Sequence, residues 1–236
     1  MSRMRFALAA IVAIPFAFCP NSYGEEEFQA GKLRAYGTFD IFAPTNAGDS
    51  LWNDVQSGMG QLSGMGYSST GSINTRAALG GRLGLMVQVT EEFDIGISGG
   101  YIAGPNSNAS VSFVGGGYSG VLSDKRDVSF ARFLLEPTLN VKIDKSSAFH
   151  FGAGLGVAQG RIKETITCSG SACSVNGNVA TNYQTWNGFT WEFSPYFSFS
   201  DFLIVVRYAG FPTFKGDTIS SKIEWNSWGA FIGFKI

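Results

Sequence analysis

Hydrophobic and polar residues alternate with a period of two along most of the chain, in segments separated by turn-forming or polar stretches. In residues 128–143, Phe133 and Leu135 fall on one face, whereas Arg132 and Glu136 fall on the other. Successive side chains of a strand point to opposite faces of a sheet, so this pattern predicts half-buried β-strands. The predicted strands are residues 32–43, 75–90, 93–104, 128–143, 148–162, 186–199, 202–211 and 223–236.

The connections between these strands alternate between two kinds. Three are short, at residues 91–92, 144–147 and 200–201. The other four are long or rich in glycine, and we predict loops there over residues 44–74, 104–127, 163–185 and 212–222. Transmembrane β-barrels have short periplasmic turns, long extracellular loops and an even number of strands, which here places both chain ends in the periplasm.

Every predicted strand has one apolar face. A soluble β-sandwich or a lipocalin-like barrel also has alternating strands, but it would not turn so wide an aromatic and aliphatic face to water. We therefore predict an all-β fold, namely an eight-stranded antiparallel up-and-down transmembrane β-barrel with short periplasmic turns and long extracellular loops, integral to the bacterial outer membrane.

The N-terminal residues follow the order of a secretory signal peptide. Two arginines precede a 14-residue apolar run, and small residues stand at the −3 and −1 positions before a cut after Gly24. The run is too short for a spanning helix, which needs about 20 residues. We predict a cleavable signal peptide over residues 1–24 and one outer-membrane barrel domain over residues 25–236. A retained anchor is the alternative.

Composition and charge bear mainly on possible ligands. Removing the signal peptide leaves 15 basic residues against 18 acidic ones, a net charge of −3, which gives no basic footprint for nucleic acid. Two cysteines then remain, Cys168 and Cys173, and in an oxidising envelope they are predicted to form a local disulfide, with free thiols as the alternative. With no histidine beside them, we predict neither a metal site nor any cofactor.

Three stretches resemble the small outer-membrane barrels of the OmpA/OmpX and opacity-protein type. They are residues 135–141 (LEPTLNV), residues 151–157 (FGAGLGV) and the C-terminal residues 228–236. The last is similar to the barrel-assembly signal of these proteins, although the chain ends in Ile236 and not in phenylalanine. The resemblance implies a monomer that contacts outer-membrane lipid and lipopolysaccharide and engages the barrel-assembly machinery through its C-terminal strand.

Charged residues also occur on the inward faces of the predicted strands, at similar depths. An eight-stranded barrel is just wide enough for side chains to fill it, and unpaired charges there would cost several kcal/mol each. We therefore predict a salt-bridge network that plugs the lumen, with a conducting pore as the alternative. The predicted network consists of Asp40, Arg82, Arg132, Glu136, Glu192 and Arg207.

The first long connection contains Leu51, Val55, Met59 and Leu62 at near-helical spacing. This spacing predicts either a short helix that rests on the barrel mouth as a lid or, given the intervening glycines, a disordered loop.

The function predicted from the sequence is a structural or surface-interaction role through the extracellular loops, and the alternative is a narrow channel for small solutes or ions. An enzyme is disfavoured because the chain holds a single histidine, His150, flanked by two phenylalanines and close to a predicted periplasmic turn.

Overall fold

The computed structural model describes residues 30–44, 47–144, 146–174, 177–214 and 226–235. This part of the chain contains one helix, α1 (Ala47–Gly64), and ten strands. The strands are β1 (Leu33–Pro44), β2 (Ser68–Thr75), β3 (Ala78–Gln88), β4 (Phe93–Ala103), β5 (Ser107–Gly115), β6 (Tyr118–Lys142), β7 (Ser147–Ser169), β8 (Gly177–Phe199), β9 (Phe202–Gly210) and β10 (Asn226–Lys235). The predicted signal peptide lies outside the described residues.

Eight of the strands close into a ring. Their order is β1-β3-β4-β6-β7-β8-β9-β10, and β10 pairs with β1 to complete the barrel. All neighbours are antiparallel, and Phe39 of β1, for example, lies opposite Ile232 on one side and Gly81 on the other. Each ring strand contains or overlaps one of the eight predicted segments, so the predicted barrel is confirmed.

The barrel is apolar outside and polar inside. Leu83 and Phe189 are 70% and 61% exposed on the outer surface, whereas Asp40 and Arg82 in the lumen are 0% and 3% exposed. Outward apolar residues on β8 run from Phe189 to Phe199, close to the length of about 9–11 residues that a tilted strand needs to cross a bilayer. An aqueous protein would bury such a surface, so this exterior is built for lipid.

Within the described residues, no helix combines the length and the hydropathy needed to cross a membrane.

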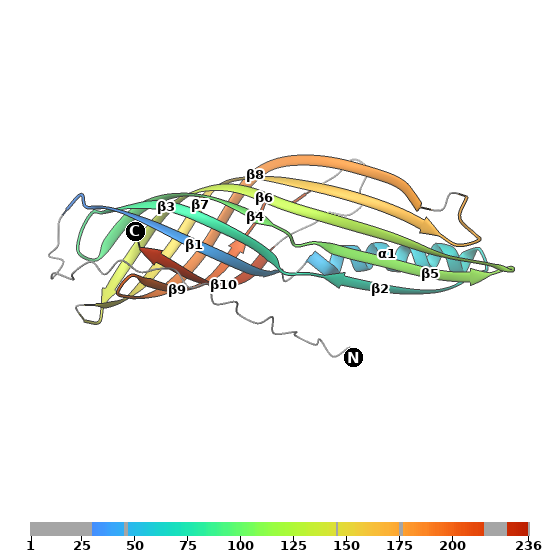
Figure 1. Ribbon diagram of the computed structural model, residues 1–236, viewed down its shortest axis with the longest axis horizontal. Coiled ribbons are helices and arrows are strands. Elements are labelled where there is room, and N and C mark those ends of the chain that lie inside the picture. Colours follow the sequence, from blue (N-terminus) through green and yellow to red (C-terminus); the bar gives the residue numbers. More distant parts are fainter. Residues whose placement is uncertain (1–29, 45–46, 145, 175–176, 215–225, 236) are drawn as a thin grey trace, which may run out of the picture.

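The short turns lie at one end of the barrel and the long connections at the other, but three of these connections, predicted as loops over 44–74, 104–127 and 163–185, consist mostly of strand and helix. Strands β6, β7 and β8 continue well beyond the ring (Figure 1). β5 and the first residues of β6 occupy most of 104–127, and β7 and β8 occupy most of 163–185. Residues 44–74 supply α1 and most of β2, and β2 pairs with β5, which pairs with the first half of β6. We call this part, formed by α1, β2, β5, residues 118–127 of β6, 163–169 of β7 and 177–185 of β8, the extension.

The extension was missed because its strands carry no wide apolar face. β2 has the sequence SSTGSINT, in which serine and threonine occupy both faces. Its backbone groups are nevertheless paired along the whole of β5, from Ser68 opposite Val114 to Thr75 opposite Ser107. Ladder hydrogen bonds and β-branched residues therefore hold these strands where hydrophobic periodicity gives no signal.

The helix of one of the two sequence alternatives forms as α1, but it packs along β2 and β5 of the extension instead of resting on the barrel mouth as a lid. Leu51 and Val55 are 1% and 5% exposed and form a small core with Ala109 and Val111 of β5. Gly71 of β2 permits this close approach, since a Cβ atom there would come within 2.4 Å of the Val55 side chain. The helix is thus a component of the extension, joined to β2 and β5.

Candidate functional site

The six predicted lumen charges meet in one buried layer at mid-barrel. Glu192 of β8 lies at its centre and forms ion pairs with Arg82 at 2.7 Å, Arg132 at 2.9 Å and Arg207 at 3.5 Å. All six side chains are 8% exposed or less. Five strands of the ring, β1, β3, β6, β8 and β9, therefore contribute side chains to a single network, which we call the ion layer.

The other two acids complete the ion layer. Asp40 accepts a hydrogen bond from Arg207 at 3.0 Å and lies 3.7 Å from Arg132. Glu136 forms an ion pair with Arg82 and accepts a hydrogen bond from the Tyr36 hydroxyl. Three arginines face three carboxylates, so the layer is formally neutral, and each arginine contacts two acids. Reciprocal pairing of this kind is what makes buried charge tolerable.

An aromatic plug fills the lumen between the ion layer and the extension. Its members are Phe42, Phe130, Trp186, Phe211 and Phe214, which come from β1, β6, β8 and the segment after β9. The Phe130 and Phe211 rings are 4.6 Å apart, and those of Trp186 and Phe214 are 4.7 Å apart. The Trp186 indole N–H donates to the carbonyl of Pro212 at 3.0 Å and so holds the segment after β9 inside the barrel.

Arg132 connects the two layers. Its guanidinium lies 5.4 Å from the centre of the Phe42 ring and 5.7 Å from that of Phe211, while it pairs below with Asp40 and Glu192. Cation–π contacts strengthen when water is absent. The plug therefore covers the side of the Arg132 guanidinium that faces away from Asp40 and Glu192 and keeps water from it.

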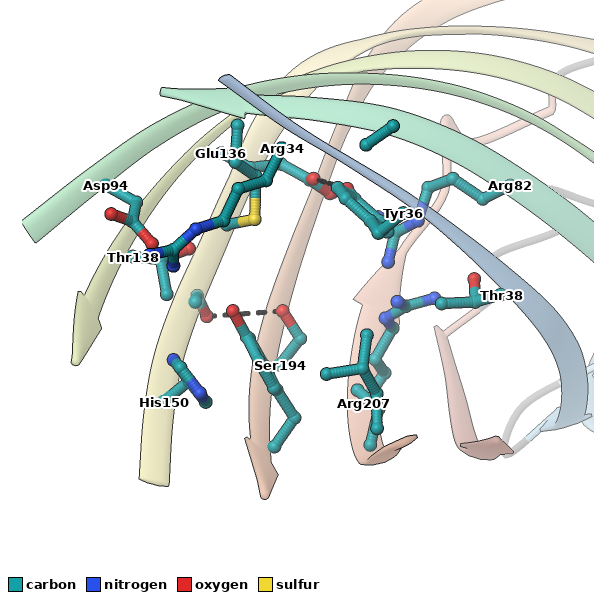
Figure 2. A pocket seen from close by; sticks show the side chains of 16 residues that line it. Arg34, Tyr36, Thr38, Arg82, Asp94, Glu136, Thr138, His150, Ser194 and Arg207 are labelled. Carbon is teal, nitrogen blue, oxygen red and sulfur yellow. Dashed lines mark hydrogen bonds and ion pairs between the residues drawn. The ribbon is translucent and has the colours of Figure 1, made fainter. Parts of the chain in front are cut away.

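A small cavity lies on the other side of the ion layer, towards the short turns. Figure 2 shows Arg34, Asp94, His150 and Ser194 around it, with Arg82 and Arg207 at its inner end. Its volume is about 50 Å³, which holds a few water molecules and no larger solute.

His150 lines this cavity in a fully bonded state. One ring nitrogen, Nδ1, lies 2.6 Å from the Asn140 amide oxygen and the other, Nε2, lies 2.8 Å from the Ser198 hydroxyl. The ring stacks on Tyr196 at 4.2 Å between centroids. In the described part of the chain, no group of three or more His, Cys, Asp or Glu residues is arranged to hold a metal ion.

A second charge cluster ties α1 to the extension. Arg126 of β6 lies 3.1 Å from Glu164, 2.8 Å from Asp124 and 3.2 Å from Asp54 of the helix. Burial raises the pKa of Asp124 from 3.8 to about 6, although Arg126 opposes the shift. At the far end of the extension, Cys168 and Cys173 form a disulfide.

Of this site, the sequence predicted the ion layer residues and the cysteine pair, and it missed the plug. Phe42, Phe130 and Trp186 occupy inward positions by strand parity, which is a signal for lumen filling that counting outward apolar residues overlooks. Phe214 carries no such signal because it lies beyond the end of β9, in a predicted loop. The rest of that predicted loop, from residue 215, lies outside the described residues.

Comparison with known proteins gives similarity of fold only. No family model matches the chain, and no curated protein matches it. Ail of Yersinia pestis, solved with a heparin analogue, is 11% identical over 88% of this chain and 100% of its own, with a TM-score of 0.43. The N-terminal barrel domain of OprF and the protein OprG, both of Pseudomonas aeruginosa, are each 12% identical over 88% of this chain and cover 100% and 96% of their own, each with a TM-score of 0.38. All three are outer-membrane proteins, the class that the sequence resembles.

Proposed function

We propose that the protein is an integral outer-membrane barrel, closed to solutes, that presents the extension at the cell surface for interaction with other molecules. The observation that carries this proposal is the filling of the lumen by two successive layers, the ion layer and the aromatic plug. A barrel filled in this way serves as an anchor, so the function belongs to what it carries.

The closed state is favoured by energetics as well as by space. Opening a path would separate ion pairs in the buried layer, at about 3–5 kcal/mol for each uncompensated partner. It would also displace Phe214, which is 2% exposed, from a packed aromatic cluster. A cavity of about 50 Å³ holds only a few water molecules, and their hydrogen bonds would not compensate for either cost.

The proposed orientation follows the general arrangement of outer-membrane barrels. Short turns face the periplasm, so the extension faces outward and both termini lie in the periplasm. The extension is suited to present a fixed surface, because α1 is held there by an apolar core and by the ion pair between Arg126 and Asp54. We assign no catalytic role to His150, because both of its ring nitrogens are engaged by neutral partners.

Two measurements test this function. Refolded wild-type protein in a planar bilayer should show no conductance steps, and a variant that combines Arg82→Ala/Glu136→Ala in the ion layer with Phe214→Ala in the plug should show them. On intact cells, a membrane-impermeant maleimide should label Ser112→Cys in the extension and not Glu91→Cys in a short turn. Steady, ion-selective conductance of the wild type would replace the closed anchor by a narrow channel, with the ion layer as its filter. Labelling of Glu91→Cys alone would reverse the orientation.

A further inference from the structure

The residue types on the outer surface of the barrel change from apolar to aromatic and then to charged towards the extension. Near the end of the apolar band, this surface carries Tyr101, Trp191, Tyr208 and Trp228, and the Tyr208 ring lies 5.5 Å from Trp191 and 4.6 Å from Trp228. At the short-turn end, the corresponding rings are phenylalanines such as Phe149. Tyr and Trp favour the interface between hydrocarbon and headgroups, so these four residues mark the membrane boundary below the extension.

Three cations project outward directly beyond this boundary. Tyr101 lies in one register row with Ala131 and Gln159, and the next outward residues on β7 are Arg161 and then Lys163. Lys125 projects from the same face of β6, and all three cations are exposed. Arg161 and Lys163, two residues apart on one strand, are separated by about 7 Å along it. Arg161 and Lys163 lie two and four residues beyond the Tyr101 row on β7, whereas Lys125 lies six residues beyond it on β6. Arg161 and Lys163 are therefore the cations nearest to the membrane boundary.

The charges around these cations do not neutralise them. Lys125 forms an ion pair with Asp127 at 3.0 Å. Lys163 lies over the Tyr183 ring at 5.6 Å, and Arg161 reaches the side-chain oxygen of Gln159 at 3.5 Å. Among the described residues, neither Arg161 nor Lys163 has a carboxylate within ion-pair distance. The patch thus has a net charge of +2 on a chain whose whole-length charge is −1.

A groove joins this patch to the apolar band. It has a volume of about 550 Å³ and is lined by Leu79, Tyr101 and Ala103, by Arg161, Lys163 and Tyr183, and by Asp127, which lies in register opposite Lys163 and pairs with Lys125. Its shape and chemistry combine an apolar floor at the membrane boundary with cations immediately above. That combination matches a molecule whose hydrocarbon lies in the membrane and whose anionic group lies at its surface.

The face above the groove is rich in hydroxyl and amide groups. On β2 and β5 the exposed outer residues include Thr70, Ser72, Asn74, Asn108 and Ser112, and the Ser72 and Ser110 hydroxyls are 2.9 Å apart. Uncharged polar groups of this kind suit hydrogen bonding to sugars. Going outward from the membrane, the same side of the protein therefore presents apolar, cationic and then hydroxyl-rich surface.

We propose that the groove holds an outer-leaflet lipid with a phosphorylated sugar headgroup, whose phosphate is bound by Arg161 and Lys163. Arginine offers paired N–H donors to phosphate oxygens, and lysine adds a second positive charge. The acyl chains lie against the outer face near Leu79 and Tyr101, and the sugars extend along the hydroxyl-rich face. This assignment rests on the proposed orientation, with the extension outside.

The test is lipid binding by the refolded full-length barrel in detergent micelles, followed by native mass spectrometry. Diphosphoryl lipid A and the same lipid without its phosphates are the probes. Wild type should bind the diphosphoryl form at least tenfold more tightly than the dephosphorylated one. Arg161→Gln/Lys163→Gln should lose that preference, whereas Lys142→Gln, an exposed cation near a short turn, should change affinity less than twofold. Heat-dependent mobility in gel electrophoresis verifies that each variant is folded.

Equal binding of both lipids, or an unchanged preference in the double variant, would overturn the assignment. Displacement of the lipid by inorganic phosphate at equal concentration would also overturn it, because the site would then recognise a free anion. The proposed function fails separately: a conducting wild type or an unlabelled Ser112→Cys contradicts the closed, outward-facing anchor, while binding in micelles is unaffected by either result.

Discussion

Replacing Glu192 by Gln should be the most damaging conservative change in the barrel. The substitution keeps the shape of the side chain and removes its charge at the point where three arginines converge, at 2.7, 2.9 and 3.5 Å. The side chain is 0% exposed, so water does not replace the lost partner. Breaking a buried pair costs about 3–5 kcal/mol, and the neutral layer is left with one excess positive charge.

The structure also identifies the change that relieves this excess. If Arg207 is removed together with Glu192, the remaining charges form two pairs, Arg82 with Glu136 and Arg132 with Asp40. The variant Arg207→Met/Glu192→Gln should therefore be less destabilised than the sum of its single variants, by about 2 kcal/mol. Methionine retains the length of the aliphatic stem, which limits the packing defect.

Urea unfolding in lipid vesicles, followed by tryptophan fluorescence, measures these free energies. Glu91→Gln is the matched control, because Glu91 forms an exposed ion pair with Lys142 at 3.7 Å and should contribute less than about 1 kcal/mol. A loss below about 1 kcal/mol in Glu192→Gln would refute the account of a dry, mutually dependent layer. Strict additivity in the double variant would refute the pairing that we infer.

Three further outcomes are expected. Phe214→Ala should destabilise the barrel by about 3–5 kcal/mol in the same unfolding assay, because the ring is 2% exposed within the plug. Burial raises the pKa of Asp124 to about 6, so the folded extension holds this proton more tightly than the unfolded chain does. Amide-exchange protection of α1 should therefore be highest below about pH 4 and should fall as the pH rises through 6. In the Asp124→Asn variant, the protection should not depend on pH over this range. Reducing the disulfide between Cys168 and Cys173 should cost only about 2 kcal/mol, because it closes a short loop, and the faster amide exchange should be confined to the tips of β7 and β8.

The barrel itself could be predicted from the sequence because lipid imposes a strict rule on it. Each outward position in the membrane must be apolar, so alternation persists over the whole span, as from Phe133 to Val141 in β6. The ion layer residues followed from the same parity, since a charge between two lipid-facing residues, such as Arg132 before Phe133, has only the lumen to enter. Which acid meets which arginine depends on register across the lumen, and no local pattern carries that.

The extension shows where the rule ends. Beyond the membrane boundary both faces of a strand meet water, and residues such as Thr165 and Thr181 can pair across β7 and β8 without any apolar alternation. Helix α1 was open to prediction because its one-sided core, Leu51 and Val55, follows helical spacing despite the glycines. A helix or strand can therefore be predicted from the sequence where one of its faces must be apolar. Where a strand is held only by backbone hydrogen bonds, the same sequence pattern predicts a loop.

The plug and the ion layer depend on each other, and this dependence bears on where function resides. Asp40 and Glu192 pair with the buried Arg132 on one side, and the rings of Phe42 and Phe211 cover it on the other. Admitting water through the plug would hydrate the arginine and weaken the same pairs that hold the strands together. Opening this barrel for a solute would therefore weaken interactions that stabilise it. The outer surface and the extension, with the exposed cations of β7 and the hydroxyl-rich strands β2 and β5, can change without that energetic cost.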